Sequence, residues 1–146
     1  MDGRDRYNIL RNAIVDSNIF IAARHKKDVN HDKAQEIIKN FAEKKILFFF
    51  TTNYALVEAI NFFMKKVEFS EVLQIYKDLC ESERIKVIYI DELMKLRIEE
   101  LFEKYKTLSL TDCSLIAVSE DLNVKNIFSF DIGFDKVKSI NRKEEI

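Results

Sequence analysis

The sequence predicts a three-layer α/β/α sandwich around a central, mostly parallel sheet of four or five strands. Two observations support this fold class: short apolar segments of strand length alternate with longer helical segments, and no Pro-, Gly- or Ser-rich linker interrupts the alternation. At 146 residues, the chain has the length of one domain. We expect a single domain over residues 1–146, with a core from about 12 to about 140 and short flexible ends.

Five segments predict the strands. Four are apolar and rich in β-branched or aromatic residues, as buried strands are, and the fifth is a short strand at the edge of the sheet. In chain order they are residues 13–15, 46–51, 85–90, 127–130 and 137–140. The tail that follows, 141–146, is expected to fray.

Six segments between these strands predict helices, from apolar residues at helical spacing or from a capping residue at the start. They are residues 17–23, 32–45, 53–64, a segment that Ser70 caps and that includes Leu79, 92–105 and 110–122. Ser109 and Asp112 form a capping box ahead of the last helix. In a parallel sheet with helices on both faces, ligands bind beyond the carboxyl ends of the strands.

Composition excludes several classes of protein. Hydrophobic residues make up 47% and charged residues 34% of the chain, which fits neither a disordered nor a membrane protein. No apolar run approaches the ~20 residues of a membrane helix, and residues 1–5 lack the apolar core of a signal peptide, so we expect a cytoplasmic protein. A net charge of -1 excludes a basic surface over the whole molecule but allows local patches for nucleic acid.

The chain has few residues for thiol or imidazole chemistry, with two cysteines and two histidines. Two cysteines, Cys80 and Cys113, can build neither a disulfide scaffold nor a zinc site, and we expect both to be buried free thiols. The two histidines are His25 and His31, which are too few to make imidazole-based metal or nucleophilic chemistry a strong expectation. Any catalysis must therefore come mainly from carboxylates.

Four carboxylates are expected to meet at one edge of the sheet. Asp16 and Asp131 directly follow strands, Asp112 lies in the first turn of a helix, and Glu58 interrupts an apolar helical stretch. Strand ends and helix starts share one edge of such a sheet, so the acids can meet there if the strands before Asp16 and Asp131 are neighbours and the helix of Glu58 runs past that edge. Gathered carboxylates repel one another unless a cation lies between them. An all-oxygen site favours Mg²⁺ or Mn²⁺, which can activate water to attack a phosphodiester.

Each of these acids also has a purely structural interpretation. Asp16 can cap a helix, Asp112 can be the return partner in the capping box, and Asp131 can form a turn ahead of Gly133. Glu58 can be a solvated helix residue. The functional hypothesis therefore depends on all four acids reaching the same edge.

Four blocks of sequence resemble, in order, those of the PIN domain family. They are residues 13–20 (AIVDSNIF), 51–58 (TTNYALVE), 108–117 (LSLTDCSLIA) and 127–135 (IFSFDIGFD). The resemblance spans most of the chain and implies a PIN-like fold. It also implies a Mg²⁺- or Mn²⁺-dependent ribonuclease.

The resemblance assigns roles by position. The acids that match the catalytic and metal-binding positions are Asp16, Glu58, Asp112 and Asp131. The residues that match supporting positions are Ser17, Asn18, Ser129 and Asp135. The chain is similar in length to the toxins of prokaryotic type II toxin–antitoxin pairs, which implies a homodimer that a small antitoxin neutralises.

Two basic clusters are candidates for binding RNA phosphates. They comprise Arg24, Lys26, Lys27, Lys65 and Lys66. The alternative is that these are ordinary solvated charges. The aromatic residues of segments 48–50 and 62–63 can stack on bases but are expected mainly in the core, and the run 62–64 could form part of a dimer face.

Other functions remain open to different degrees. A housekeeping RNA-processing nuclease would use the same chemistry, and a non-catalytic PIN-like domain would bind RNA or a partner without cutting. A haloacid-dehalogenase-like phosphatase also places an Asp after its first strand. That enzyme needs a second Asp two residues later, where this chain has Asn18.

Overall fold

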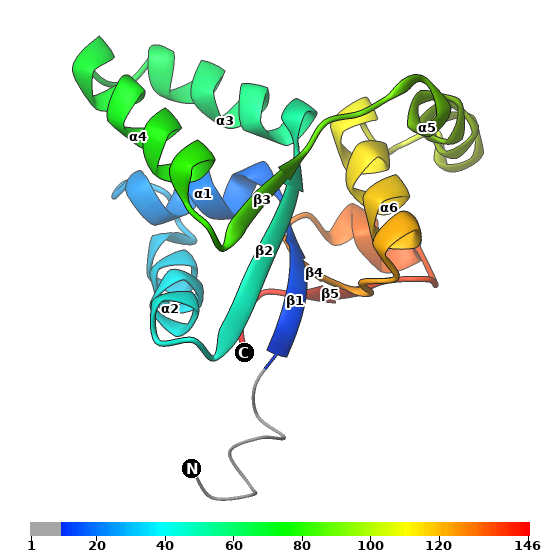
Figure 1. Ribbon diagram of the computed structural model, residues 1–146, viewed down its shortest axis with the longest axis horizontal. Helices are drawn as coiled ribbons and strands as arrows, with labels where there is room; N and C mark the ends of the chain where they lie inside the picture. Colours follow the sequence, from blue (N-terminus) through cyan, green and yellow to red (C-terminus); the bar gives the residue numbers. More distant parts are fainter. Residues whose placement is uncertain (1–9) are drawn as a thin grey trace, which may run out of the picture.

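The computed structural model describes residues 10–146 and contains a five-stranded sheet in which every neighbouring pair of strands is parallel (Figure 1). The strands are β1 (Leu10–Val15), β2 (Ile46–Thr52), β3 (Ile85–Ile88), β4 (Asn126–Phe128) and β5 (Asn141–Lys143). Their order across the sheet is β3-β2-β1-β4-β5. The expected flexible amino-terminal end lies outside the described residues.

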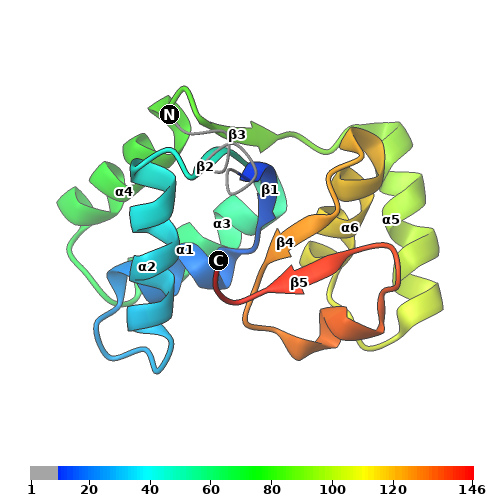
Figure 2. The same cartoon turned by 90° about the horizontal axis from the view of Figure 1, so that it is seen from below.

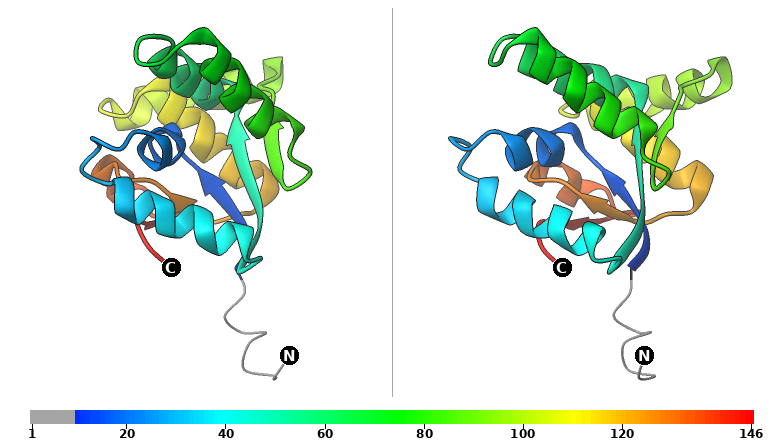
Figure 3. Two further views of the ribbon diagram at one scale, coloured as in Figure 1. Left: turned by 90° about the vertical axis from the view of Figure 1, so that its left-hand side faces the viewer. Right: turned by 60° about the vertical axis from the view of Figure 1, so that its left-hand side comes forward.

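Helices cover the two faces of this sheet, which confirms the predicted three-layer sandwich (Figures 2 and 3). They are α1 (Ser17–Arg24), α2 (His31–Ala42), α3 (Asn53–Met64), α4 (Phe69–Glu81), α5 (Glu92–Tyr105) and α6 (Leu110–Leu122), with a short 3-10 helix η2 (Ile132–Lys136) after β4. Among residues 10–146, no helix is long and apolar enough to cross a membrane.

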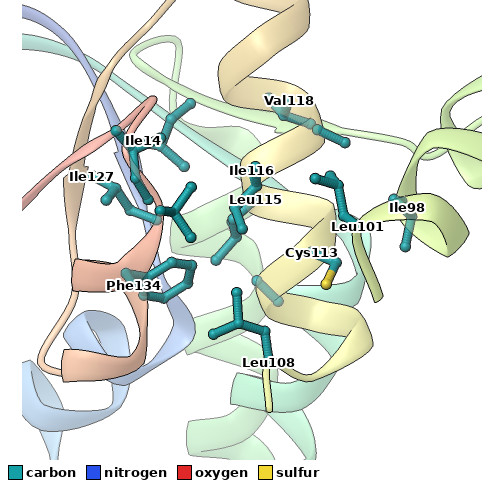
Figure 4. Packing of buried hydrophobic residues seen from close by; sticks show 14 of the residues in the cluster. Ile14, Ile98, Leu101, Leu108, Cys113, Leu115, Ile116, Val118, Ile127 and Phe134 are labelled. Carbon is teal, nitrogen blue, oxygen red and sulfur yellow. The ribbon is translucent and has the colours of Figure 1, made fainter. Parts of the chain in front are cut away.

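The alternation of side chains along β1 divides the core between the two faces. Ile14 packs with the residues of α5 and α6, whereas Ala13 and Val15 pack with those of α1, α2, α3 and α4. Figure 4 shows Ile14 and Ile127 of neighbouring strands on one side of Leu115 and Ile116 of α6. Both faces of β1 are buried, as expected for the central strand of a parallel sheet.

Two features of the topology determine where the acids lie. β1 and β4 are neighbours, with Val15 opposite Phe128, so the residues after both strands emerge at the same edge. α3 lies at the edge where β2 ends and contributes to both cores, through Ala55 to one and Leu56 to the other (Figure 1). Its second turn, which carries Glu58, therefore also lies at the carboxyl edge.

The fifth strand is not where the sequence predicted it. The segment 137–140 buries Val137 and Ile140 in the core but forms no strand, whereas β5 follows in the tail that was expected to fray. Asn141–Lys143 are polar residues, and backbone bonds such as Ser129 N–H to the carbonyl of Lys143 hold them beside β4. Edge pairing of this kind leaves no hydrophobic pattern for sequence reasoning to detect.

Smaller corrections concern caps, strand ends and a cysteine. α4 begins at Phe69 with Glu68 as N-cap, so Ser70 is not the cap. β3 and β4 end at Ile88 and Phe128, two residues earlier than predicted. Cys80 is exposed on α4 rather than buried, whereas Cys113 is buried as expected.

Candidate functional site

Asp16 lies at the carboxyl end of β1 and is almost completely buried, with 3% of its surface exposed. Its Oδ1 accepts the backbone N–H of Ser17 at 2.7 Å, so Asp16 caps α1. Its Oδ2 accepts from Ser129 Oγ at 2.7 Å and from Asn18 Nδ2 at 3.2 Å. Donors from three residues thus orient a single buried carboxylate.

The residues predicted to support Asp16 also contact one another. Asn18 Nδ2 donates to Ser129 Oγ at 3.1 Å, and Asn18 Oδ1 accepts the backbone N–H of Phe130 at 3.3 Å. Ser129 in turn accepts the backbone N–H of Asp131 at 3.0 Å. This hydrogen-bond network links the end of β1 to the end of β4.

Glu58 approaches Asp16 from α3. Ser17 Oγ donates to Glu58 Oε1 at 2.7 Å and also lies 3.3 Å from Asp16 Oδ1. One serine therefore stands between two of the predicted acids. Glu58 is itself exposed, which agrees with its solvated interpretation as well as with a site open to substrate.

Asp112 and Asp131 have local partners as well. The carboxylate of half-buried Asp112 accepts the backbone N–H of Ser109 at 3.0 Å, which completes the predicted capping box of α6. Exposed Asp131 accepts the backbone N–H of Gly133 at 2.8 Å through Oδ1. Each acid therefore does the structural work that the alternative interpretation assigned to it.

The four acids influence one another electrostatically. Burial is the main cause that raises the pKa of Asp16, and the charges of Asp112 and Glu58 act in the same direction. Hydrogen bonds from Ser129 and Ser17 oppose the shift, and the pKa that results is about 7. Burial also raises the pKa of Asp112, and the charges of Asp131 and Glu58 add to this rise. Within residues 10–146, none of the four acids forms an ion pair with a basic side chain.

The donor set fits a hard divalent cation in its chemistry, although its oxygens are not gathered around one point. In the described part of the chain, no three Asp, Glu, His or Cys side chains are placed ready to hold a metal ion together. The structure instead shows four neighbouring carboxylates whose mutual repulsion a divalent cation would relieve. Oxygen-only donors at such a site suit Mg²⁺ or Mn²⁺ better than zinc.

The basic residues predicted to bind RNA differ in their surroundings: Arg24 is paired with an acid, whereas Lys65 shares a groove with Glu58. Arg24 forms an ion pair with Asp78 of α4 at 2.5 Å, and the length of α1, about 12 Å at 1.5 Å per residue, separates it from Asp16. Lys65 lines a shallow groove of about 500 Å³ that also contains Glu58.

The exposed lysines after α1 come close to those after α3. The ring centroids of His25 and Phe62 are 5.3 Å apart, which brings the loop with Lys26 and Lys27 near the end of α3. The Lys66 ammonium lies 5.8 Å from the centre of the Phe62 ring.

Four of the five aromatic candidates pack in the core, whereas half-buried Phe48 belongs to neither core cluster. Phe49 is fully buried on β2, Phe63 is buried on α3, and Phe62 is half-buried against the same core. Of the run 62–64, which was considered for a dimer face, only Met64 is exposed, with 53% of its surface accessible.

Asp135 is paired with a residue that sequence reasoning missed. Its carboxylate accepts from Arg142 Nε at 2.8 Å. Arg142 lies on β5, within the tail that was expected to fray, so nothing in the sequence drew attention to it. Its guanidinium also donates to the backbone carbonyl of Ser129 at 3.1 Å, next to the network around Asp16.

Comparison with known proteins identifies a family match and several similar structures. A family model for the PIN domain matches residues 13–140. No curated protein sequence matches the chain.

Solved structures support the same fold. The chain is similar to Mycobacterium tuberculosis VapC20, a sarcin-ricin loop cleaving toxin, with a TM-score of 0.75 and 17% identity over 86% of this chain and 95% of that one. It is similar to VapBC2 of Rickettsia felis bound to a promoter DNA fragment, with a TM-score of 0.68 and 12% identity over 90% and 97%. A toxin–antitoxin complex from Klebsiella pneumoniae gives a TM-score of 0.68 and 16% identity over 92% and 99%.

Proposed function

The chain belongs to the PIN domain family, and from this premise we propose that it is a Mg²⁺- or Mn²⁺-dependent ribonuclease, the toxin of a prokaryotic type II toxin–antitoxin pair. The observation that carries the proposal is the buried Asp16, surrounded by donors and close enough to Glu58 and Asp112 for their charges to raise its pKa. Such an arrangement is costly for folding and is typical of a functional site.

The residues that would hold the cation are Asp16, Glu58, Asp112 and Asp131. A bound divalent ion would neutralise charge that develops on the phosphate and make water in the site more acidic. The chain itself orients these acids: Ser129 and Asn18 hold Asp16, Ser17 holds Glu58, and backbone amides hold the other two. The hydrogen bonds within this set involve groups on α1, α3, α6 and the end of β4.

The substrate we propose is RNA, held by phosphate contacts beside the acids. Lys65 shares a groove with Glu58, and Lys66, Lys26 and Lys27 lie at the same end of α3, where they can bind RNA phosphates on that side of the acids. Arg24 is the weakest of the proposed contacts because its guanidinium is already paired with Asp78. Asp135 is likewise engaged with Arg142, so its supporting role is to hold the loop of Asp131.

The partners we propose are a second copy of the chain and a small antitoxin in the cytoplasm. The similar structure from Klebsiella pneumoniae is a toxin–antitoxin complex, which supports the antitoxin by analogy. Exposed apolar side chains such as Met64 and Leu93 are candidates for contact with a protein.

Cleavage of RNA with Mn²⁺ supplied tests the nuclease. Loss of outer-shell partners alone usually weakens a metal site about 10- to 100-fold, so loss of a direct ligand in Asp16→Asn should lower the rate more than about 100-fold. Asp121→Asn, at the far end of α6 from Asp112, is the matched control and should cleave normally. Equal rates for wild type and Asp16→Asn would remove Asp16 from the site.

Growth of cells that express the protein separates a toxin from a housekeeping nuclease. Induction of the wild-type chain without an antitoxin should arrest growth, and induction of Asp16→Asn should not. RNA cleavage in vitro without growth arrest would favour the housekeeping role.

A further inference from the structure

The guanidinium of Arg142 joins the two ends of the loop that carries Asp131. Its Nη1 donates to the backbone carbonyl of Ser129 at 3.1 Å, before Asp131. Its Nε and Nη2 donate to the two carboxylate oxygens of Asp135, after Asp131, at 2.8 and 3.3 Å. One planar side chain thus closes the segment 129–135, and a further bond to Glu144 at 2.7 Å fixes the guanidinium itself.

Ser129 is the residue through which this closure reaches the acids. Its side chain is fully buried, its hydroxyl donates to Asp16 Oδ2 at 2.7 Å, and it accepts from Asn18 and from the backbone N–H of Asp131. A hydroxyl has one donor and two acceptor positions, so all three are in use. Any shift of Ser129 must therefore disturb both Asp16 and Asp131.

Arg142 differs from an ordinary surface ion pair. Only 14% of its side chain is exposed, and it holds a backbone carbonyl as well as two carboxylates. Arg97 is a useful contrast: it makes bidentate bonds to Glu120 and a bond to Glu100, but 44% of its side chain is exposed and it joins only α5 and α6. Exposed pairs of that kind contribute little to structure or function.

We propose that Arg142 is a positioning residue that fixes Ser129 and Asp131 relative to Asp16 and so sets the affinity of the site for a divalent cation. This inference rests on the proposed function, because it assumes that these acids bind the cation. It assigns to β5, a strand of polar residues at the edge of the sheet, the task of holding the loop at the end of β4.

Calorimetric titration with Mn²⁺ alone tests the proposal. Arg142→Ala should weaken Mn²⁺ binding about 10- to 100-fold, the usual effect of removing an outer-shell partner, whereas Arg97→Ala should leave it unchanged. Arg142→Lys, which keeps the charge but has a single nitrogen, should also weaken binding, and it serves if the alanine variant does not fold. Wild-type affinity in both Arg142 variants would overturn the proposal.

A double-mutant cycle separates positioning from a general loss of structure. If Arg142 acts through Asp131, Arg142→Ala should weaken Mn²⁺ binding much less in an Asp131→Asn background than in the wild type. Thermal unfolding without metal should show that the variants fold. An equal fold-loss in both backgrounds would mean that Arg142 does not act through Asp131, and would overturn the part of the proposal that concerns Asp131.

Failure of the nuclease hypothesis can be told apart from failure of this one. If the wild-type chain binds no Mn²⁺, the proposed function fails, and hydrogen exchange of the amides of Asp131 and Gly133 decides whether Arg142 holds the loop. Faster exchange of these amides in Arg142→Ala than in Arg97→Ala would support the positioning role. Equal exchange in the two variants would overturn it.

Discussion

At the scale of single residues, Asp16 shows how one side chain combines a structural and a chemical role. One oxygen caps α1 through the backbone N–H of Ser17, and the other is held by Ser129 and Asn18. The hydrogen bonds favour the ionised form, but burial opposes it more strongly, so the pKa rises to about 7. Near neutral pH, Asp16 is therefore protonated in a fraction of the folded molecules, whereas an exposed aspartate would be fully ionised.

This shift predicts a particular pH dependence of stability for the metal-free protein. Between the unfolded pKa near 3.8 and the folded pKa of about 7, the folded state holds more protons than the unfolded state. The free energy of unfolding should therefore fall as pH rises through this range, relative to that of Asp16→Asn, whose amide does not titrate.

Urea unfolding at several pH values measures the difference. Wild type should be relatively more stable near the acidic end of the range and lose this advantage toward pH 8, while Asp16→Asn should lack that component. Added Mn²⁺ should reduce the loss in the wild type, because a cation favours the ionised carboxylate. Parallel profiles for the two proteins would contradict the assignment of the shift to Asp16.

At the scale of elements, the junction between β2 and α3 determines where Glu58 lies. Thr52 is fully buried, its Oγ1 accepts the backbone N–H of Ala55 at 3.2 Å, and it lies 2.8 Å from Ser114 Oγ of α6. Thr51, its neighbour, is also buried, yet its hydroxyl has no hydrogen-bond partner among residues 10–146. Adjacent threonines thus make opposite contributions to one junction.

A pair of isosteric substitutions tests this contrast. Thr52→Val removes a helix cap and a buried hydrogen bond and should lower the free energy of unfolding by about 1–2 kcal/mol. Thr51→Val removes an unsatisfied hydroxyl and should be neutral or stabilise the protein by up to about 1 kcal/mol. Urea unfolding midpoints of the two variants give the comparison, and an equal loss in both would show that Thr51 has a partner.

At the scale of the whole molecule, the positions of the basic side chains, rather than the net charge, must account for any attraction of RNA. The chain has 24 basic and 25 acidic residues, so its net charge of -1 provides no general attraction for RNA. The lysines after α1 and α3 lie at the end of the molecule where His25 meets Phe62. Other lysines, such as Lys39 late in α2 and Lys125 before β4, lie toward the opposite edge of the sheet.

Paired substitutions of equal charge should separate these two ends. In an Asp16→Asn background that prevents cleavage, Lys65→Gln with Lys66→Gln should weaken RNA binding and reduce its logarithmic salt slope by about 1–1.5, and Lys26→Gln with Lys27→Gln should act similarly. The control pair, Lys39→Gln with Lys125→Gln, changes the net charge equally and should keep the wild-type slope. Fluorescence anisotropy of a labelled RNA measures all three, and equal slopes throughout would return these lysines to ordinary solvated charges.

The sequence by itself determined the layered fold and the positions of the four acids along it. Strand and helix periodicity is a local property, so segments such as 46–51 and 92–105 could be assigned without knowing their neighbours. The rule that strand ends share an edge predicted that Asp16 and Asp131 would emerge together if their strands were neighbours, and the pairing of β1 with β4 meets that condition. For Glu58 the sequence only suggested that its helix passes the same edge, and the contacts of Ser17 with both Glu58 and Asp16 show that it does.

Only the tertiary structure decided which groups those acids contact and what holds them. β5 consists of polar residues paired through backbone hydrogen bonds, so no hydrophobic side-chain pattern predicts it. For the same reason, the sequence did not indicate that Arg142, which lies on β5, contacts the backbone of Ser129. The directions of the carboxylate oxygens depend on donors such as Ser129, which is 113 residues from Asp16 along the chain. Contacts between distant segments arise from packing, and local sequence carries no record of them.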